Sequence, residues 1–177
     1  ADDVGVLALA GIMGGKRSAI SDDTTNIVLE SAFFDPLTIA GRARRFGLHT
    51  DASARFERGV DFELPSIALD RAVSLIVAVA GGQLGARTTV ETLSALPTRP
   101  SIDVPLSKIK SLLGIEIATA QIVDILTALG LTVTQNESTL TCIPPSHRYD
   151  LSIAEDVVEE IARIYGYDNI TPTLPSF

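Results

Sequence analysis

Four carboxylate side chains lie close together near the C-terminal end of the sequence: Asp150, Asp156, Glu159 and Glu160. On a helix, positions 156, 159 and 160 are three and four residues apart and therefore share a face. Like charges at these spacings repel by about 0.2–0.5 kcal/mol per pair, which predicts a compensating cation or a basic partner surface. The alternative is a solvated acidic first turn that interacts favourably with the helix dipole, and the spacing leaves both interpretations open.

A single carboxylate, Glu30, follows an apolar stretch that is otherwise suited to burial. The residues from Asn26 onward predict a buried strand over 26–33. A buried carboxylate needs a hydrogen-bond partner or a polar ligand to offset its desolvation, so Glu30 is a candidate acceptor for a hydroxyl group. A strand-end glutamate at the surface is the competing interpretation.

Two loops of small residues are candidate pocket walls. Residues 11–15 (GIMGG) let the backbone approach a ligand, because glycine tolerates positive φ. Residues 49–53 (HTDAS) gather hydrogen-bonding groups in a loop between helices. A simple turn has the same composition, and the glycine loop lacks the spacing of a phosphate-binding motif.

Composition narrows the class of protein. The chain of 177 residues is 46% hydrophobic and 20% charged, which is typical of a globular protein. Its net charge of −8 opposes a general attraction to phosphate, so any RNA contact must be local. One cysteine and two histidines provide neither a disulfide nor a zinc site, and no Ser-His-acid arrangement can be placed by spacing. No apolar run reaches the ~20 residues of a membrane span, and we expect a cytoplasmic protein without a membrane partner.

The elements that position these residues fall into two domains, 1–97 and 98–177, joined by the proline-containing connector LPTRP. The first domain is predicted as α/β (α+β). Asp35-Pro36 is a helix start and Gly47 a helix stop, and a second helix with a broad apolar face is expected in the core. The predicted elements are strands over 4–10, 26–33 and 88–93 and helices over 37–46 and 64–80.

The second domain is predicted as a small helix-rich, winged-helix-like domain with a β-hairpin. Its elements are a strand over 102–104, a helix from Ser107 to Gly114, a helix over 119–129 capped by Thr119, a hairpin turn at 135–138 and a last helix over 152–165. Ser152 and Glu155 are expected to form a capping box at the start of that helix. Five basic and ten acidic residues give residues 98–177 a net charge of −5, which disfavours an independent nucleic-acid-binding module.

Four longer motifs resemble one family. Residues 29–36 (LESAFFDP) and 47–61 (GLHTDASARFERGVD) are similar to the editing domain of the bacterial phenylalanyl-tRNA synthetase beta subunit. Residues 144–150 (PPSHRYD) and 159–170 (EEIARIYGYDNI) resemble the domain that follows it. The motifs are long, collinear and spread over essentially the whole chain.

The resemblance implies an editing pocket for tyrosine mischarged onto tRNA(Phe). An apolar phenylalanine pocket cannot strongly exclude an analogue that merely adds a hydroxyl, so a second hydrolytic site is required. By the resemblance, Glu30 accepts the tyrosine para-hydroxyl, Thr50 and Ala52 shape the pocket, and Gly14 places backbone beside the substrate. The earlier half of the editing domain, with a histidine-containing part of the pocket, is expected upstream of Ala1, so the isolated segment is expected to be inactive.

The resemblance also implies a metal site and partners. Asp150, Asp156, Glu159 and Glu160 correspond to Mg²⁺ ligands shared with the alpha subunit, which holds the ATP-dependent activating site. The expected partners are that subunit, in an α2β2 heterotetramer, and tRNA(Phe); no DNA partner is expected. The alternative is a structural or subunit-interaction module without editing activity.

Overall fold

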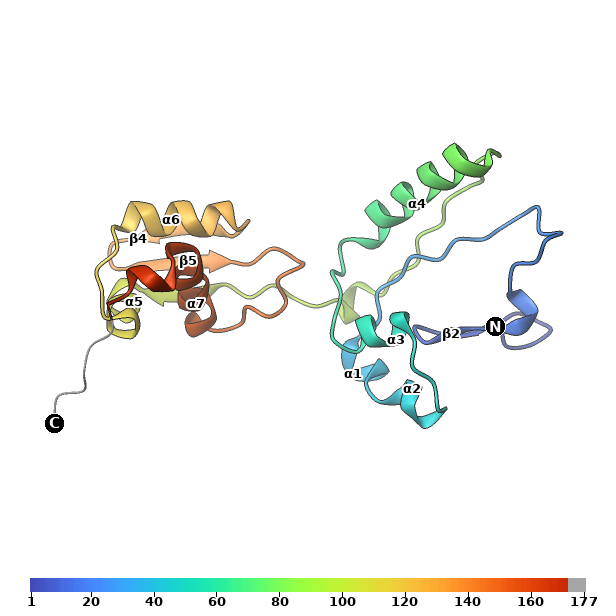
Figure 1. Cartoon of the computed structure of the whole chain (residues 1–177), viewed down its shortest axis with the longest axis horizontal. Helices are drawn as coiled ribbons and strands as arrows, with labels where there is room; N and C mark the ends of the chain where they lie inside the picture. The colour runs from blue at the N-terminus through green and yellow to red at the C-terminus, as the bar shows by residue number, and fades with distance from the viewer. Residues whose placement is uncertain (172–177) are drawn as a thin grey trace. The chain divides into compact units, whose positions relative to one another are not determined.

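The computed structural model describes residues 1–171, and the chain divides into two compact units, Ala1–Leu96 and a second one from Pro97 onward (Figure 1). The last six residues of the predicted second domain lie outside the described residues. Both units mix helices with a small antiparallel sheet. Within residues 1–171 no helix is both long and apolar enough to cross a membrane.

The second unit is built on a three-stranded antiparallel sheet with the order β3-β5-β4. Its strands are β3 (Ile102–Pro105), β4 (Thr132–Asn136) and β5 (Thr139–Ile143). Side chains alternate between faces along a strand, and here one face is buried, because Val104 and Leu140 are register partners with no exposed surface. The hairpin β4–β5 confirms the predicted turn at 135–138.

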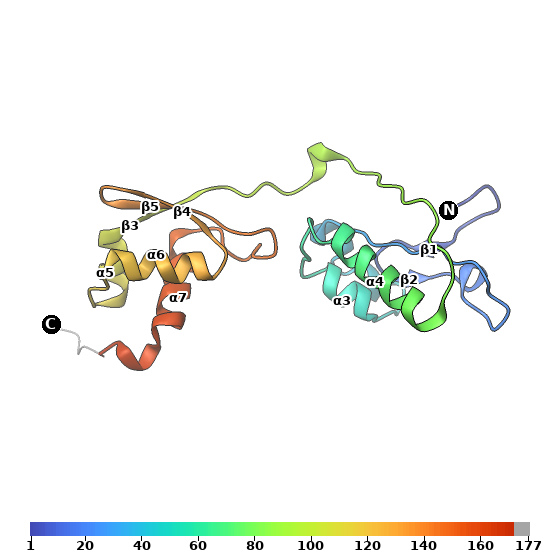
Figure 2. The same cartoon turned by 90° about the horizontal axis from the view of Figure 1, so that it is seen from above.

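Three helices cover that buried face: α5 (Leu106–Leu113), α6 (Thr119–Ala128) and α7 (Ala154–Tyr165), followed by the short turn η3 (Tyr167–Asn169). Figure 2 shows all three helices on one side of the sheet. Each fully buried aliphatic side chain contributes about 1.5–3 kcal/mol, so this core accounts for the unit's cohesion. Its fully buried members are Val104, Leu126, Leu140, Cys142, Val157 and Ile161.

The helix ends in this unit differ in detail from the expectation. Gly114 ends α5 in the left-handed conformation at φ 68°, as predicted. Thr119 is the first helical residue of α6 and not its cap, and Ala118 occupies the cap position without a side-chain hydrogen bond. The helix α7 begins at Ala154, two residues later than predicted.

The first unit has a small core at its N-terminal end. A short hairpin of β1 (Ala8–Leu9) and β2 (Met13–Gly14) is followed by η1 (Lys16–Ser18). Three short helices come later in the chain: α1 (Pro36–Ile39), α2 (Arg42–Arg45) and α3 (Asp51–Phe56). The core that joins them consists of Ile12, Ile39 and Ala43, packed against Phe34, Leu48 and Phe56.

The helix expected over 37–46 is interrupted. Asp35 caps its start as predicted, with its carboxylate accepting from the backbone N–H of Thr38 at 3.2 Å. Gly41, however, has φ 71°, a left-handed conformation that ends α1 and precedes α2. The predicted start and end of this helical segment are therefore confirmed, but Gly41 divides it into two short helices.

The long strands expected in the first unit are wrong. Only Ala8–Leu9 of the 4–10 segment forms a strand, and residues 26–33 and 88–93 contain none; the turn η2 (Leu93–Ala95) ends the latter. Val28 is 98% exposed, so the 26–33 segment is not buried either. A strand requires a partner for its backbone groups, and among the described residues these segments have none.

The helix expected over 64–80 is confirmed as α4 (Pro65–Ala80). The expectation that this helix lies in a core is wrong, because none of its residues is buried. Ile67 and Val79 are 66% and 87% exposed. Figure 1 shows the returning segment after α4 running back along it. Arg87 in that segment pairs with Asp70 of α4 at 2.9 Å and donates to Ser66 at 3.2 Å.

Candidate functional site

The Thr50 hydroxyl both accepts and donates a hydrogen bond, and these bonds hold the residue in place. It is the N-cap of α3, and its hydroxyl oxygen accepts from the backbone N–H of Ser53 at 3.0 Å, while the Ser53 hydroxyl accepts from the Thr50 N–H at 3.2 Å. The Thr50 hydroxyl also donates to the carbonyl of Ile12 at 2.6 Å. This contact ties the start of α3 to the glycine loop 11–15.

The structure therefore brings three of the four predicted editing residues into one neighbourhood. Gly14 lies in β2, two residues after the Ile12 carbonyl that accepts from Thr50. Ala52 is the second residue of α3 and is exposed.

Glu30 is separate from that group. It lies in the extended segment between η1 and α1, is exposed, and makes no hydrogen bond or ion pair within residues 1–171. The burial expected for this carboxylate is therefore wrong for the chain as described, because the segment that carries it is not part of a sheet. Its carboxylate oxygens are free to accept a hydroxyl from a ligand.

A cavity of about 670 Å³ opens next to Glu30 in the first unit. Its walls are the segment after Glu30, the residues before and at the start of α4, and the returning segment 87–92. Phe33 and Phe62 form part of the lining and meet edge to face, with ring centroids 6.1 Å apart. Gly14, Glu30, Thr50 and Ala52 are not among its lining residues, so it is not the predicted pocket.

In the second unit, Arg148 holds two of the four predicted metal ligands. Its Nε and Nη2 donate to the Oδ1 and Oδ2 of Asp150 at 2.9 and 2.7 Å. The same Nη2 lies 3.0 Å from Oε1 of Glu160 on α7. The hydrogen bonds from Arg148 hold the pKa of Asp150 below its usual value.

Glu160 is buried, with 8% of its surface exposed, and is bound by a second arginine from its own helix. Arg163, three residues later, donates from Nη2 to Oε2 and from Nε to Oε1. The hydrogen bonds from Arg163 and then Arg148 lower the pKa of Glu160 to about 2. Sequence analysis missed both arginines, although the i, i+3 spacing of Glu160 and Arg163 is a recognisable ion-pair signal.

The other two carboxylates of the set behave differently. Asp156 lies in the first turn of α7, and its Oδ2 accepts from the backbone N–H groups of Ser152 and of the N-cap residue Ile153 at 2.8 and 2.9 Å. These bonds lower the pKa of Asp156. Glu155, which was expected to form the capping box, instead pairs with Lys108 at 2.6 Å, because α7 starts later than predicted. Glu159 is exposed.

The four carboxylates do not form a cation site within the chain as described. Among residues 1–171 no group of three or more His, Cys, Asp and Glu side chains is arranged to hold a metal ion. Three of the four are already engaged, by guanidinium groups or by backbone N–H groups. Their arrangement does not fit a Mg²⁺ ion, and their role as metal ligands stays a prediction.

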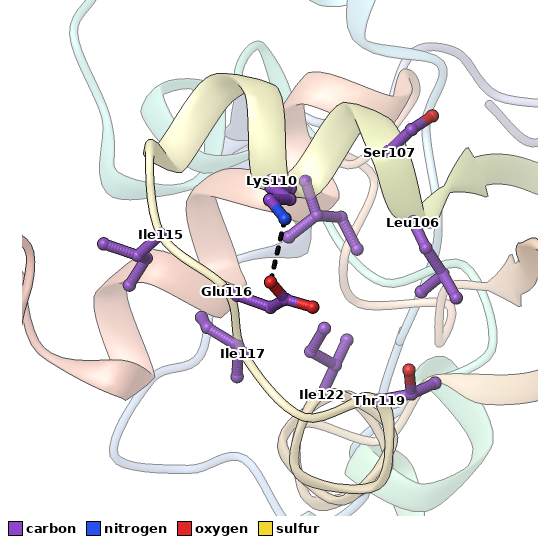
Figure 3. A pocket seen from close by; sticks show the side chains of 9 residues that line it. Leu106, Ser107, Lys110, Ile115, Glu116, Ile117, Thr119 and Ile122 are labelled. Atoms are coloured by element: carbon purple, nitrogen blue, oxygen red, sulfur yellow. Dashed lines mark hydrogen bonds and ion pairs between the residues drawn. The ribbon is translucent and has the colours of Figure 1, made fainter.

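A second, smaller cavity of about 220 Å³ lies between α5 and α6 (Figure 3). Its lining is mostly aliphatic and includes Ile115, Ile117 and Ile122, and an ion pair of 2.8 Å between Lys110 and Glu116 crosses its mouth. It contains none of the predicted site residues.

Comparison with known proteins assigns a class to both units. Residues 1–81 match the family of B3/4 domains, and residues 102–167 match the family of tRNA synthetase B5 domains. Together with the capped α3 and the arginine-bound acidic helix, these matches define the chain as an aminoacyl-tRNA synthetase segment in which a B3/4 domain precedes a B5 domain.

The particular family follows from individual relatives. The chain is 62% identical over 175 residues to the phenylalanine–tRNA ligase beta subunit of Psychrobacter arcticus. It is 54% identical over 176 residues to that of Acinetobacter baylyi and 49% over 175 residues to that of Yersinia pestis. Each alignment covers 99% of this chain and 22% of the relative, so the chain spans about a fifth of the length of these relatives. The chain belongs to the family of bacterial phenylalanine–tRNA ligase beta subunits.

Proposed function

We propose that this chain is the part of a phenylalanine–tRNA ligase beta subunit that contributes to hydrolytic editing of tyrosyl-tRNA(Phe) and to contact with the alpha subunit. The observation that carries the proposal is 62% identity over 99% of the chain to a beta subunit, with the B3/4 and B5 matches in the same order. The whole enzyme attaches phenylalanine to tRNA(Phe) in the cytoplasm. ATP acts at the alpha subunit of an α2β2 heterotetramer, and Mg²⁺ is the metal that the family resemblance assigns to the contact between the two subunits.

Glu30 is the proposed selector for tyrosine. A phenol hydroxyl is the only group that separates tyrosine from phenylalanine, and a site that hydrogen-bonds a substrate hydroxyl discriminates strongly against an analogue that lacks it. The exposed Glu30 carboxylate, without a partner among the described residues, is suited to accept that hydroxyl.

Thr50, Ala52 and Gly14 form the proposed floor of the same pocket. The hydrogen bond between Thr50 and Ile12 supports this assignment, because it fixes the glycine loop beside the start of α3. Ala52 leaves space that a larger side chain would fill. The chain spans 22% of the length of its relatives, so we expect the isolated chain to be inactive.

The second unit is the proposed contact with the alpha subunit. Its order of strand, two helices, hairpin and helix is consistent with a winged-helix-like domain. The exposed Glu159 and the exposed apolar Ile164 on α7 favour a protein contact at this helix. A purely structural or subunit-interaction module, without editing, is the second candidate, and loss of editing in a chimeric enzyme separates the two.

A segment exchange tests the proposal. The matching segment of the Psychrobacter arcticus beta subunit is replaced by residues 1–177, and the chimeric beta subunit is assembled with the alpha subunit of the same organism. We expect formation of Phe-tRNA(Phe) and clearance of Tyr-tRNA(Phe) at rates within about tenfold of the parent, because single-site differences outside a pocket are usually small in energy. An assembled chimera that charges tRNA but leaves Tyr-tRNA(Phe) intact contradicts the editing role.

A further inference from the structure

Arg148 links the segment between β5 and α7 to the helix α7. Arg148 lies in this segment, and its guanidinium binds Asp150 on the same segment and Glu160 on the helix. Only 19% of the Arg148 side chain is exposed, and only 10% of the Glu160 side chain. The contact between them is therefore largely shielded from water and bridges two elements that are twelve residues apart in sequence.

Every oxygen of the two carboxylates has a guanidinium donor. Both oxygens of Asp150 accept from Arg148. Oε1 of Glu160 lies 3.0 Å from Arg148 and 3.3 Å from Arg163, and Oε2 is bound by Arg163. Two carboxylates and two guanidinium groups leave the cluster with no net formal charge. Guanidinium groups bind carboxylates in this forked way because their donors lie in one plane.

A divalent cation has no place in this arrangement. Mg²⁺ requires six oxygen ligands at 2.0–2.1 Å in near-octahedral geometry. Each oxygen of Asp150 and Glu160 already accepts from a guanidinium group, and the two guanidinium groups would repel the ion at contact distance. The bonds from Asp156 to the backbone at the start of α7 would also have to break.

We infer that Arg148 and Arg163 are the resident counter-ions of Asp150 and Glu160, and that this neutral cluster, and not a divalent cation, fastens the 144–151 segment to α7. Arg148 is then a positioning residue of the second unit. Loss of the Arg148 side chain leaves the buried Glu160 carboxylate with one partner fewer. Removing the partner of a buried ion is strongly destabilising in protein interiors.

The test uses the full chain and its thermal unfolding, followed by circular dichroism in EDTA and in 10 mM MgCl₂. We expect the same midpoint temperature with and without Mg²⁺. The substitution Arg148→Met should lower the midpoint of the second unit by about 10 °C or more. Arg148→Lys should recover part of the loss, since it restores the charge but not the fork. The matched control is Glu137→Gln, an exposed acid in the β4–β5 turn of the same unit, which should shift the midpoint by less than about 2 °C.

A second measurement needs no variant. It distinguishes the arginine cluster from a bound cation even if Arg148→Met fails to fold. Mn²⁺ broadens NMR signals of the residues that bind it, and in the unsubstituted chain we expect no selective broadening at Asp150, Asp156, Glu159 or Glu160. Selective broadening there, or a midpoint raised by Mg²⁺, overturns the inference. So does an unchanged midpoint for Arg148→Met. None of these results bears on family membership or on editing, which the segment exchange tests separately.

Discussion

Cys142 shows how a single residue responds to burial. It lies in β5, opposite Ile102 of β3, and its side chain has no exposed surface. Burial, with a smaller contribution from the charge of Asp103, raises the pKa of the Cys142 thiol from about 9 to about 11. The sequence identified this cysteine only as unpaired, because its burial depends on the alternation of a strand within a sheet.

The shifted thiol pKa predicts a loss of stability in alkali. In the unfolded chain the thiol ionises near pH 9, whereas in the folded chain it stays neutral to about pH 11, so ionisation favours unfolding between these values. We expect the free energy of unfolding to fall by about 1 kcal/mol from pH 8 to pH 10 through this group. Urea titrations at both pH values measure it. The fall should be smaller by that amount in Cys142→Val, and equal slopes in the two proteins contradict the assignment.

At the scale of elements, local sequence signals were sufficient to predict the helices and strands of the second unit. Glycine at position 114, the polar turn before β5 and the apolar spacing of α7 all predict elements that the structure confirms. Helix starts were less certain, because several acids at the start of α7 have the residue type of a cap. Only the geometry identifies Asp156, and not Glu155, as the residue that binds the free backbone N–H groups.

The capping role of Asp156 is testable against its neighbour. Asp156→Ala removes the acceptor for two backbone N–H groups at the start of α7, and we expect it to lower the free energy of unfolding by about 1 kcal/mol. Glu159→Ala, on the exposed side of the same helix, should change it by less than about 0.5 kcal/mol. Denaturant unfolding in EDTA measures both. Equal effects of the two substitutions would show that the Asp156 carboxylate does not stabilise the start of α7.

At the scale of the whole molecule, the two units differ in how far the sequence predicted them. The second unit has a closed core of its own, so periodicity and turn signals lead directly to its fold. In the first unit the segments 4–10, 26–33 and 88–93 contain strand-forming residues, but such a segment does not identify the partner that pairs with it. The apolar face of α4 is likewise left without a cover among the described residues.

The two candidate sites also differ in how far the sequence predicted them. Family resemblance selected Gly14, Glu30, Thr50 and Ala52, and the structure links the glycine loop to Thr50 through a contact that no spacing rule predicts. For the acidic set, the sequence left open a compensating cation or basic partner and a solvated acidic first turn. The structure supplies two arginines of the same chain, one of which is separated from Glu160 by twelve residues.

The most direct test of the account is the hydrolysis of Tyr-tRNA(Phe) by the assembled chimeric enzyme with Glu30→Ala. Loss of a hydrogen bond to a charged acceptor costs about 1.5–3 kcal/mol, so we predict that hydrolysis slows by about tenfold or more, while Phe-tRNA(Phe) formation is unchanged. The matched control is Glu137→Ala, an exposed glutamate in the β4–β5 turn, which should edit normally. If Glu30→Ala clears Tyr-tRNA(Phe) at the same rate as the unsubstituted chimera, the editing assignment of this segment is wrong.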